Sequence, residues 1–303
     1  MKKIIIIALL FIAGRVIAQD STHKATELFS SERAILSNTT ETVGKGKMKF
    51  LVTHYFDDAG GSNGGLKSFF GLDNSQDVRI GFNFGLTDRL DLAIARAKSG
   101  HPFAQLRMDR NYEIALKYQL MRQLENDPSH PISVAIFFSN IISALDTAKT
   151  LFYKFQGLGD RMSQCFQLIV AKKIGKVSVQ LNPTITIAGY TPSYDLQPTM
   201  FALGGVVRFP AGKRFNIIVD YIHPFRNDES KAAFESKSIK FHDPLGVGVE
   251  ILTSGHVFTL NFTNATQMQE ARFIPYNIKR WGHGEFRWGF TVSRKFTLWR
   301  DKK

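Results

Sequence analysis

The feature that most constrains the fold of this chain is a strict two-residue alternation that resumes after a short break. In the stretch VRIGFNFGLTDRLDLAIAR (residues 78–96), Val78, Ile80 and Phe82 alternate with small or polar residues up to GLTDR, after which Leu90 restarts the pattern. Successive side chains of a β-strand point to opposite faces, so this pattern predicts two antiparallel strands joined by a tight turn. Each strand would have one apolar face and one polar face.

The same alternation recurs along the chain and predicts twelve strands. Their apolar positions span residues 48–56, 78–86, 90–94, 112–120, 132–138, 166–170, 177–187, 201–209, 215–221, 245–251, 258–262 and 286–298. Because the apolar residues are spread out singly rather than gathered in runs, the pattern is typical of sheets with one apolar face.

The connections between these strands alternate in length. GLTDR, KKIGK, PAGKR and TSGH are short, RQLENDPSHP is somewhat longer, and the connections between them are longer still, over residues 57–76, 98–111, 140–161, 189–198, 223–242 and 264–284. Tight turns at one end and long loops at the other are typical of outer-membrane barrels, which have an even number of strands. We therefore predict an all-β fold, a transmembrane antiparallel up-and-down β-barrel of about 12 strands. A secreted sandwich or a soluble barrel is the alternative.

The first residues of the chain have the composition of an export signal. Lys2 and Lys3 precede ten consecutive apolar residues, 4–13, and small residues follow before residue 19. This order predicts a secretory signal peptide over residues 1–18. A spanning helix needs about 20 apolar residues, so a helical anchor is not expected.

The expected organisation is one barrel with flanking segments. Residues 19–46 would form a periplasmic N-terminal segment, residues 47–298 the outer-membrane barrel and residues 299–303 a C-terminal tail. Both termini would lie in the periplasm, with six loops outside the cell. Residues 19–46 are long enough either to plug the lumen from the periplasm or to trail there, and the sequence favours neither.

An excess of basic residues narrows the expected partners. The chain has 39 Lys and Arg against 26 Asp and Glu, but they are scattered, whereas a nucleic-acid site needs them clustered. We expect no nucleic-acid partner; we expect contact with outer-membrane lipid and lipopolysaccharide, and with small solutes, particularly anions. The single cysteine, Cys165, cannot form a disulfide within the chain, which argues against a disulfide-stapled secreted domain. The sequence does not indicate an oligomeric state.

Long segments of the chain are similar to one known family. They are SERAILSNTTETVGKGKMKFLVTHYF, FFGLDNSQDVRIGFNFGLTDRL, IALKYQLMRQ, FQLIVAKK, GHVFTLNFTNAT and WGHGEFRWGFTVSRKF, and they run from about Ser31 to Phe296. These segments resemble the uncharacterised outer-membrane β-barrel family labelled domain of unknown function 5777, most specifically in FFGLDN followed by GLTDRL and in GHVFTLNFTN. The resemblance implies an outer-membrane protein of a Gram-negative bacterium, and no activity comes with it.

Polar residues on the lumenal faces of the predicted strands are the candidate functional residues. They are Arg79, Asn83, Asp91, Glu113, Lys117, Arg208, Asp220, Glu250, Arg287 and Lys295. They could line a narrow, porin-like passive channel for small solutes, with a preference for anions because of the basic excess. They could instead pair with one another in the closed lumen of a structural or interaction barrel without transport activity. Eight-stranded barrels are filled by side chains and sixteen-stranded ones contain a channel, so about twelve strands leave both alternatives open.

No motif in the sequence predicts catalysis. The chain has no HExxH, no paired CxxC and no GxSxG, so we expect no catalytic, cofactor-binding or metal-binding residues and no cofactor. An activity like that of outer-membrane lipases is the remaining enzymatic alternative.

Two residues fit the expected strands poorly. Pro183 lies in a strand but cannot donate a ladder hydrogen bond, so it should mark a bulge or a part of the strand that projects beyond the membrane. Arg294 lies on the lipid-facing side, where a charge at the membrane midplane costs about 2–4 kcal/mol. We therefore expect Arg294 near the periplasmic interface.

Overall fold

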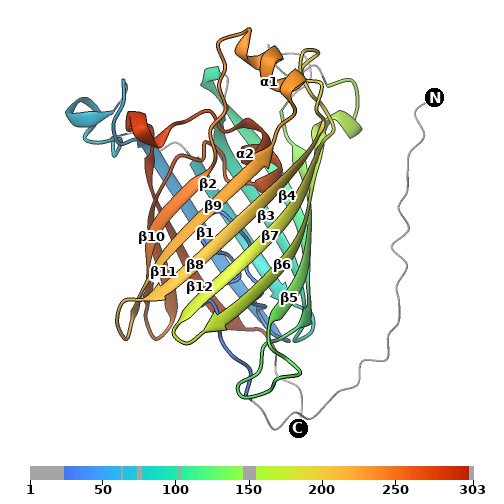
Figure 1. Cartoon of the computed structure of the whole chain (residues 1–303), viewed down its shortest axis with the longest axis vertical. Helices are drawn as coiled ribbons and strands as arrows, with labels where there is room; N and C mark the ends of the chain where they lie inside the picture. The colour runs from blue at the N-terminus through green and yellow to red at the C-terminus, as the bar shows by residue number, and fades with distance from the viewer. Residues whose placement is uncertain (1–23, 63, 74–76, 102–103, 146–154, 300–303) are drawn as a thin grey trace.

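Twelve antiparallel strands close into a barrel (Figure 1). The computed structural model describes residues 24–62, 64–73, 77–101, 104–145 and 155–299. The strands are β1 (Lys47–Asp58), β2 (Asp77–Gly85), β3 (Leu90–His101), β4 (Ala104–Met121), β5 (Ser133–Ser143), β6 (Met162–Ile174), β7 (Val177–Ala188), β8 (Thr199–Pro210), β9 (Phe215–Phe225), β10 (Leu245–Leu252), β11 (His256–Thr263) and β12 (Arg287–Thr297). Each strand pairs with its neighbours along the chain, and β1 pairs with β12 to close the barrel. The predicted fold is confirmed.

The two-residue alternation places apolar side chains outside the barrel and polar ones inside. Phe82 of β2 lies opposite Ile94 of β3, and these side chains are 38% and 47% exposed on the outer surface. Arg79, on the opposite face of β2, is buried in the lumen. An apolar exterior around a polar interior is the arrangement that a barrel needs to lie in a membrane.

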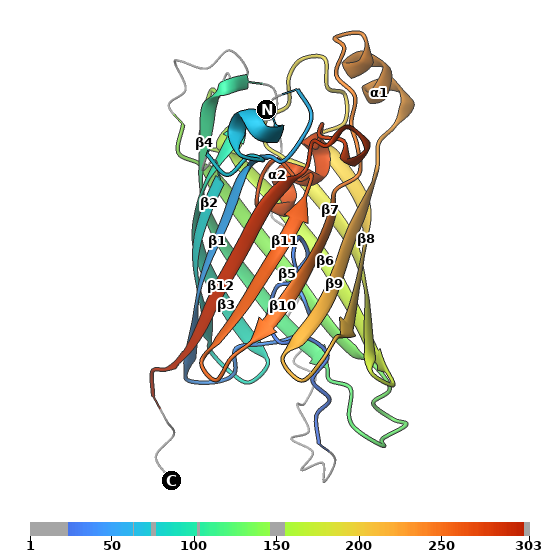
Figure 2. The ribbon, with the colours of Figure 1, turned by 90° about the vertical axis from the view of Figure 1, so that its left-hand side faces the viewer.

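The two ends of the barrel differ in their connections. At one end, named here the short-turn end, β6 and β7 are joined by residues 175–176, β8 and β9 by 211–214, and β10 and β11 by 253–255. The other end, named the loop end, carries the helices and longer connections, except that β3 and β4 are separated by residues 102–103 alone (Figures 1 and 2). The connection between β4 and β5, residues 122–132, is a long one at the short-turn end. The helices are η1 (Gly65–Ser68), η2 (Gly159–Arg161), α1 (Asp228–Glu235), α2 (Glu270–Tyr276) and η3 (Trp281–His283).

Within the described residues, none of these helices has the length and apolar content needed to cross a membrane.

The predicted long connection over residues 98–111 is wrong. β3 and β4 continue to pair into this range, with Lys98 opposite Arg110 and Ser99 opposite Asp109, and the register shifts only after Gly100. Ser99 and Asp109 are buried inside, whereas Lys98 and Arg110 are exposed outside. Charged residues can stand on the outer face of a hairpin that extends beyond the apolar band. The last apolar residue on the outer face of a strand therefore marks the edge of the apolar band around the barrel. The strand itself continues beyond that edge.

Pro183 interrupts one ladder without changing its register. Pairing between β6 and β7 stops between Gln167 opposite Thr184 and Val170 opposite Leu181, and the offset is the same on both sides. The bulge, one of the two alternatives expected for Pro183, is therefore absent at this position of the described strand. The interruption has a simple cause, because proline has no N–H to donate.

Arg294 lies close to the short-turn end of the barrel. It pairs with His256, the first residue of β11, which directly follows the turn 253–255. Its guanidinium carbon lies 5.2 Å from the centre of the Phe296 ring. This position keeps the charge away from the middle of the apolar band.

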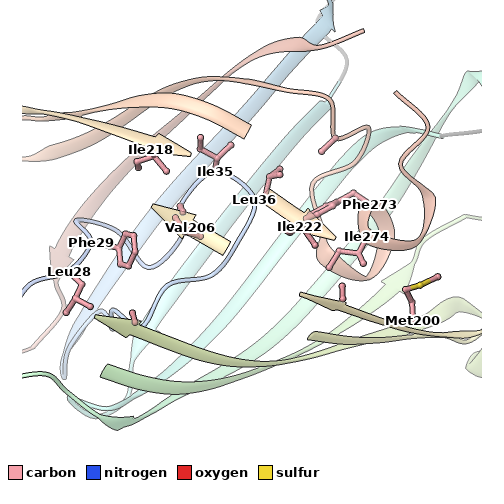
Figure 3. Packing of buried hydrophobic residues seen from close by; sticks show 14 residues of the cluster. Leu28, Phe29, Ile35, Leu36, Met200, Val206, Ile218, Ile222, Phe273 and Ile274 are labelled. Carbon is pink, nitrogen blue, oxygen red and sulfur yellow. The ribbon is translucent and has the colours of Figure 1, made fainter. Parts of the chain in front are cut away.

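Residues 24–46, named here the lumenal segment, run inside the barrel from the short-turn end (Figure 2). Figure 3 shows Ile35 and Leu36 of this segment among side chains of the barrel wall. The apolar cluster inside the barrel joins three parts of the chain, and its larger members are Leu28, Phe29, Ile35, Leu36, Met200, Val206, Ile218, Ile222, Phe273 and Ile274. Of the two alternatives for residues 19–46, the described part therefore fills the lumen. Residues 1–18, expected as a signal peptide, lie outside the described residues.

Candidate functional site

The wall of the barrel holds the backbone N–H groups of the lumenal segment. The Asp220 carboxylate accepts hydrogen bonds from the N–H groups of Leu36 and Ser37 at 2.7 and 2.8 Å, and from the Ser37 hydroxyl at 2.8 Å. The Asp91 carboxylate accepts the N–H of Val43, at 3.0 and 3.2 Å to its two oxygens. Buried backbone groups need such partners because an irregular segment satisfies only some of them with its own hydrogen bonds. Two predicted lumenal acids thus bind the chain's own backbone.

The wall also holds the carbonyl groups of the lumenal segment. The Lys117 ammonium donates to the carbonyl oxygens of Glu32 and Thr39 at 3.1 and 3.2 Å. The Gln119 amide donates to the Thr40 carbonyl at 2.8 Å. Lumenal side chains of the wall therefore supply both hydrogen-bond donors and hydrogen-bond acceptors to the backbone of the segment.

Glu32 brings a negative charge into a basic part of the lumen. Its carboxylate lies 2.7 Å from the Lys49 ammonium, and both side chains are buried. Burial opposes ionisation of Glu32, but the charges of Lys49, Lys117 and Lys295 outweigh it and hold its pKa below the ordinary value. A carboxylate of the chain itself therefore occupies the place where three lysines would attract an anion.

A second segment enters the lumen from the loop end and meets the first. It carries α2, whose Glu270 forms a salt bridge of 2.7 Å with Arg33 and accepts a hydrogen bond from the Asn38 amide at 2.9 Å. The neighbouring Gln269 donates to Glu113 of β4 at 3.1 Å. The described lumen is therefore occupied from both ends.

Three further ion pairs join lumenal side chains of different strands. Arg79 lies 3.1 Å from Glu113, Arg208 lies 3.1 Å from Glu250, and Arg287 lies 2.7 Å from Asp77. Arg208 also donates to the Leu28 carbonyl at 3.3 Å. Pairing of this kind was one of the two alternatives for the lumenal charges.

The structure brings most of the ten predicted lumenal residues together around the two inserted segments. Those that are buried are Arg79, Asp91, Glu113, Lys117, Arg208, Asp220, Glu250 and Arg287. Asn83 is half-buried and borders a small central cavity, and Lys295 is exposed at the short-turn end.

Sequence reasoning left open whether residues 19–46 fill the lumen, and it did not identify the side chains that do so. Leu28, Phe29, Ile35 and Leu36 precede the first strand without helical or two-residue periodicity. One feature of the sequence indicates their role: they are large apolar side chains in a segment expected in water. Such side chains need a surface to pack against. The α2 segment shows a similar feature. Its residues 271–274, ARFI, include large apolar side chains that are unusual in a surface loop.

The space left in the lumen is small. A central cavity of about 20 Å³ is bordered by Arg33 and Glu113, and this is room for about one water molecule. A larger cavity of about 400 Å³ opens at the short-turn end, where Glu41, Arg122 and Lys295 border it. Among the described residues, no group of three His, Cys, Asp or Glu side chains is placed to hold a metal ion.

Comparison with known proteins identifies one family. The profile of the family described as membrane bound beta barrel domain (DUF5777) matches residues 29–296. Comparison with curated proteins gave no match.

Three solved structures illustrate the general likeness to other barrels. The NanC porin is 7% identical, with 83% of this chain and 100% of that chain covered and a TM-score of 0.47. The KdgM porin is 9% identical, with 82% and 99% covered and a TM-score of 0.47. An outer membrane channel from Pseudomonas putida F1 is 14% identical, with 85% and 98% covered and a TM-score of 0.47. At these scores the likeness carries no conclusion about function.

Proposed function

Because the chain belongs to the DUF5777 family of membrane-bound β-barrel domains, we propose that it is an outer-membrane channel for small solutes whose lumenal segment is its gate. In the described state this gate is closed. The observation that carries the proposal is the binding of the Leu36 and Ser37 N–H groups by Asp220, a contact that water can replace. The signal peptide expected over residues 1–18 would direct export, and the short-turn end would face the periplasm.

The polar character of the contacts supports a segment that can leave. An intramolecular hydrogen bond to a charged group contributes about 1.5–3 kcal/mol net, much less than its strength without water, because water takes its place when it breaks. The wall groups that hold the segment, such as Asp91, Lys117 and Asp220, are polar and would be hydrated in an empty lumen. Departure of the segment would thus leave a wettable pore lined with charges.

The lysines around Glu32 support a preference for anions. When the segment is in place, the Glu32 carboxylate lies against Lys49, while Lys117 binds carbonyl oxygens of the segment. When it leaves, Lys49 and Lys117 lose these partners and Lys295 loses a nearby negative charge. We infer that anionic solutes pass this part of the lumen and take the place of Glu32.

Electrical conductance of the purified protein in planar bilayers tests the gate. Asp220→Ala removes the acceptor of three hydrogen bonds from the segment, so we expect more frequent current steps than in the wild type. Asp228→Ala, exposed in α1 at the loop end, is the matched control and should behave like the wild type. Equal currents in the wild type and Asp220→Ala would show that the segment is not the gate.

A closed barrel with a structural or interaction role is the second candidate. The apolar contacts favour it, because Leu28, Phe29 and Leu36 are buried and each large apolar side chain stabilises by about 1.5–3 kcal/mol. Such a segment would be a permanent part of the core. If neither Asp220→Ala nor a variant lacking residues 24–43 conducts after folding into membranes, this second function is the correct one.

A further inference from the structure

The connection between β1 and β2 carries four large apolar side chains that are exposed on its surface. Leu66 is 84% exposed and Phe69 is 60% exposed, and Phe70 and Leu72 are also exposed. Lys67 is the one charged residue among residues 66–72, named here the apolar tip. Contiguous exposed apolar side chains mark a surface that meets an apolar partner.

The backbone fixes the apolar tip in a strained conformation. Phe69 and Phe70 have φ angles of +46° and +56°, in the left-handed region that bulky residues rarely adopt. The Gly71 carbonyl accepts the N–H of Asp57 at 3.1 Å, and the Gly71 N–H donates to the buried Ser68 hydroxyl at 3.1 Å. The two phenylalanines are therefore held outward by a base anchored to β1. Strain of this kind concentrates at functional sites.

The base of the same connection is tied to the chain that leads into β12. The N–H of Ala59 donates to the Phe286 carbonyl at 2.6 Å, and the N–H of Gly60 donates to the Gly284 carbonyl at 2.8 Å. Figure 1 shows the light-blue segment that contains η1 projecting sideways beyond the barrel wall at the loop end, and Figure 2 shows it at the level of the loops, above the upper ends of β1 and β12. The apolar tip therefore overhangs the outer surface.

Aromatic side chains gather next to this attachment. The rings of Trp281 and Phe286 stack with their centres 4.6 Å apart, and those of Phe262 and Trp288 lie 4.0 Å apart. Aromatic residues form girdles where membrane barrels meet the interface between lipid and water. The apolar tip continues this aromatic surface away from the barrel.

We propose that the apolar tip inserts into the membrane interface at the loop end and anchors the barrel there. Lipid is the partner that fits, because the tip adjoins an aromatic membrane-facing surface and because Lys67 suits the anionic head groups above it. The inference rests on the membrane-bound barrel and is independent of the gate.

Environment-sensitive fluorescence of the whole protein tests the anchor. Phe69→Cys is labelled with the fluorophore NBD, and the barrel is folded into liposomes; Cys165 is fully buried and does not react. We expect emission shifted to shorter wavelength and strong quenching by lipids brominated in their acyl chains. Glu229→Cys in α1, exposed at the same end, is the control and should show neither. Leu66→Cys provides a second probe of the tip.

Two results would overturn the proposal. One is water-like, unquenched emission from the labels at both positions of the tip, 69 and 66. The other is a protected probe that brominated lipid does not quench, together with a disulfide-linked dimer of the unlabelled Phe69→Cys protein. The second result would assign the tip to contact between two copies of the chain.

Discussion

Ile35 packs so closely on Gly246 of β10 that a Cβ atom on residue 246 would lie 2.6 Å from the Ile35 Cγ2 atom. Glycine at this position makes room for the lumenal segment. The relationship shows that wall and segment are fitted to each other at the level of single methyl groups.

Gly246→Ala should displace the lumenal segment, because the new methyl group cannot share the space with Ile35. We expect faster hydrogen exchange of the backbone N–H groups around Ile35, and restoration of slow exchange in the double variant with Ile35→Ala. Gly205→Ala on β8 is the matched control, since its Cβ would meet its nearest neighbour at an ordinary 3.9 Å. Unchanged exchange in Gly246→Ala would contradict the observed packing.

Glu32 and Lys49 should be energetically coupled. Removing one partner leaves the other charge buried, so Glu32→Gln and Lys49→Met should each lower the free energy of unfolding by about 3–5 kcal/mol. The double variant should lose less than both single losses together. Urea titrations of the folded fraction measure this cycle, with the exposed Lys47→Met as the control. Additive losses would mean that the pair makes no contact in the folded barrel.

The contribution of Glu32 should depend on pH. Its pKa lies below the ordinary 4.5 because nearby lysine charges outweigh the effect of burial. A carboxyl whose pKa is lower in the folded state stabilises the fold above its unfolded pKa, and the contribution is lost as the pH falls through the folded value. The difference in unfolding free energy between the wild type and Glu32→Gln should therefore be full at neutral pH and shrink below about pH 4.5. If the difference in unfolding free energy grew as the pH fell, the pKa of Glu32 would have to lie above its ordinary value in the folded barrel.

The barrel could be predicted from the sequence because its signal is local. Alternation at Val78, Ile80 and Phe82 reports the two faces of a strand directly, and all twelve predicted strands are present. The extent of β3 and β4 could not be predicted in the same way. At Lys98 and Arg110 the outward residues become polar although the ladder continues.

The filling of the lumen could not be predicted because its contacts are distant in sequence. Leu36 meets Asp220 across 184 positions, and Arg33 meets Glu270 across 237. The lumenal segment has no regular hydrogen-bond pattern of its own, so periodicity carries no information about it. The alternation predicts that residues such as Asp220 face the lumen. It does not predict which group binds the Asp220 carboxylate.

A reversible cross-link between the lumenal segment and the wall tests the gate most directly. The Ser37 hydroxyl lies 2.8 Å from an Asp220 oxygen, so cysteines at both positions can be joined by oxidation. We predict that the oxidised Ser37→Cys, Asp220→Cys protein carries no single-channel current and that reduction of the same protein produces current steps. Current of equal size and frequency before and after reduction would contradict the proposed gate.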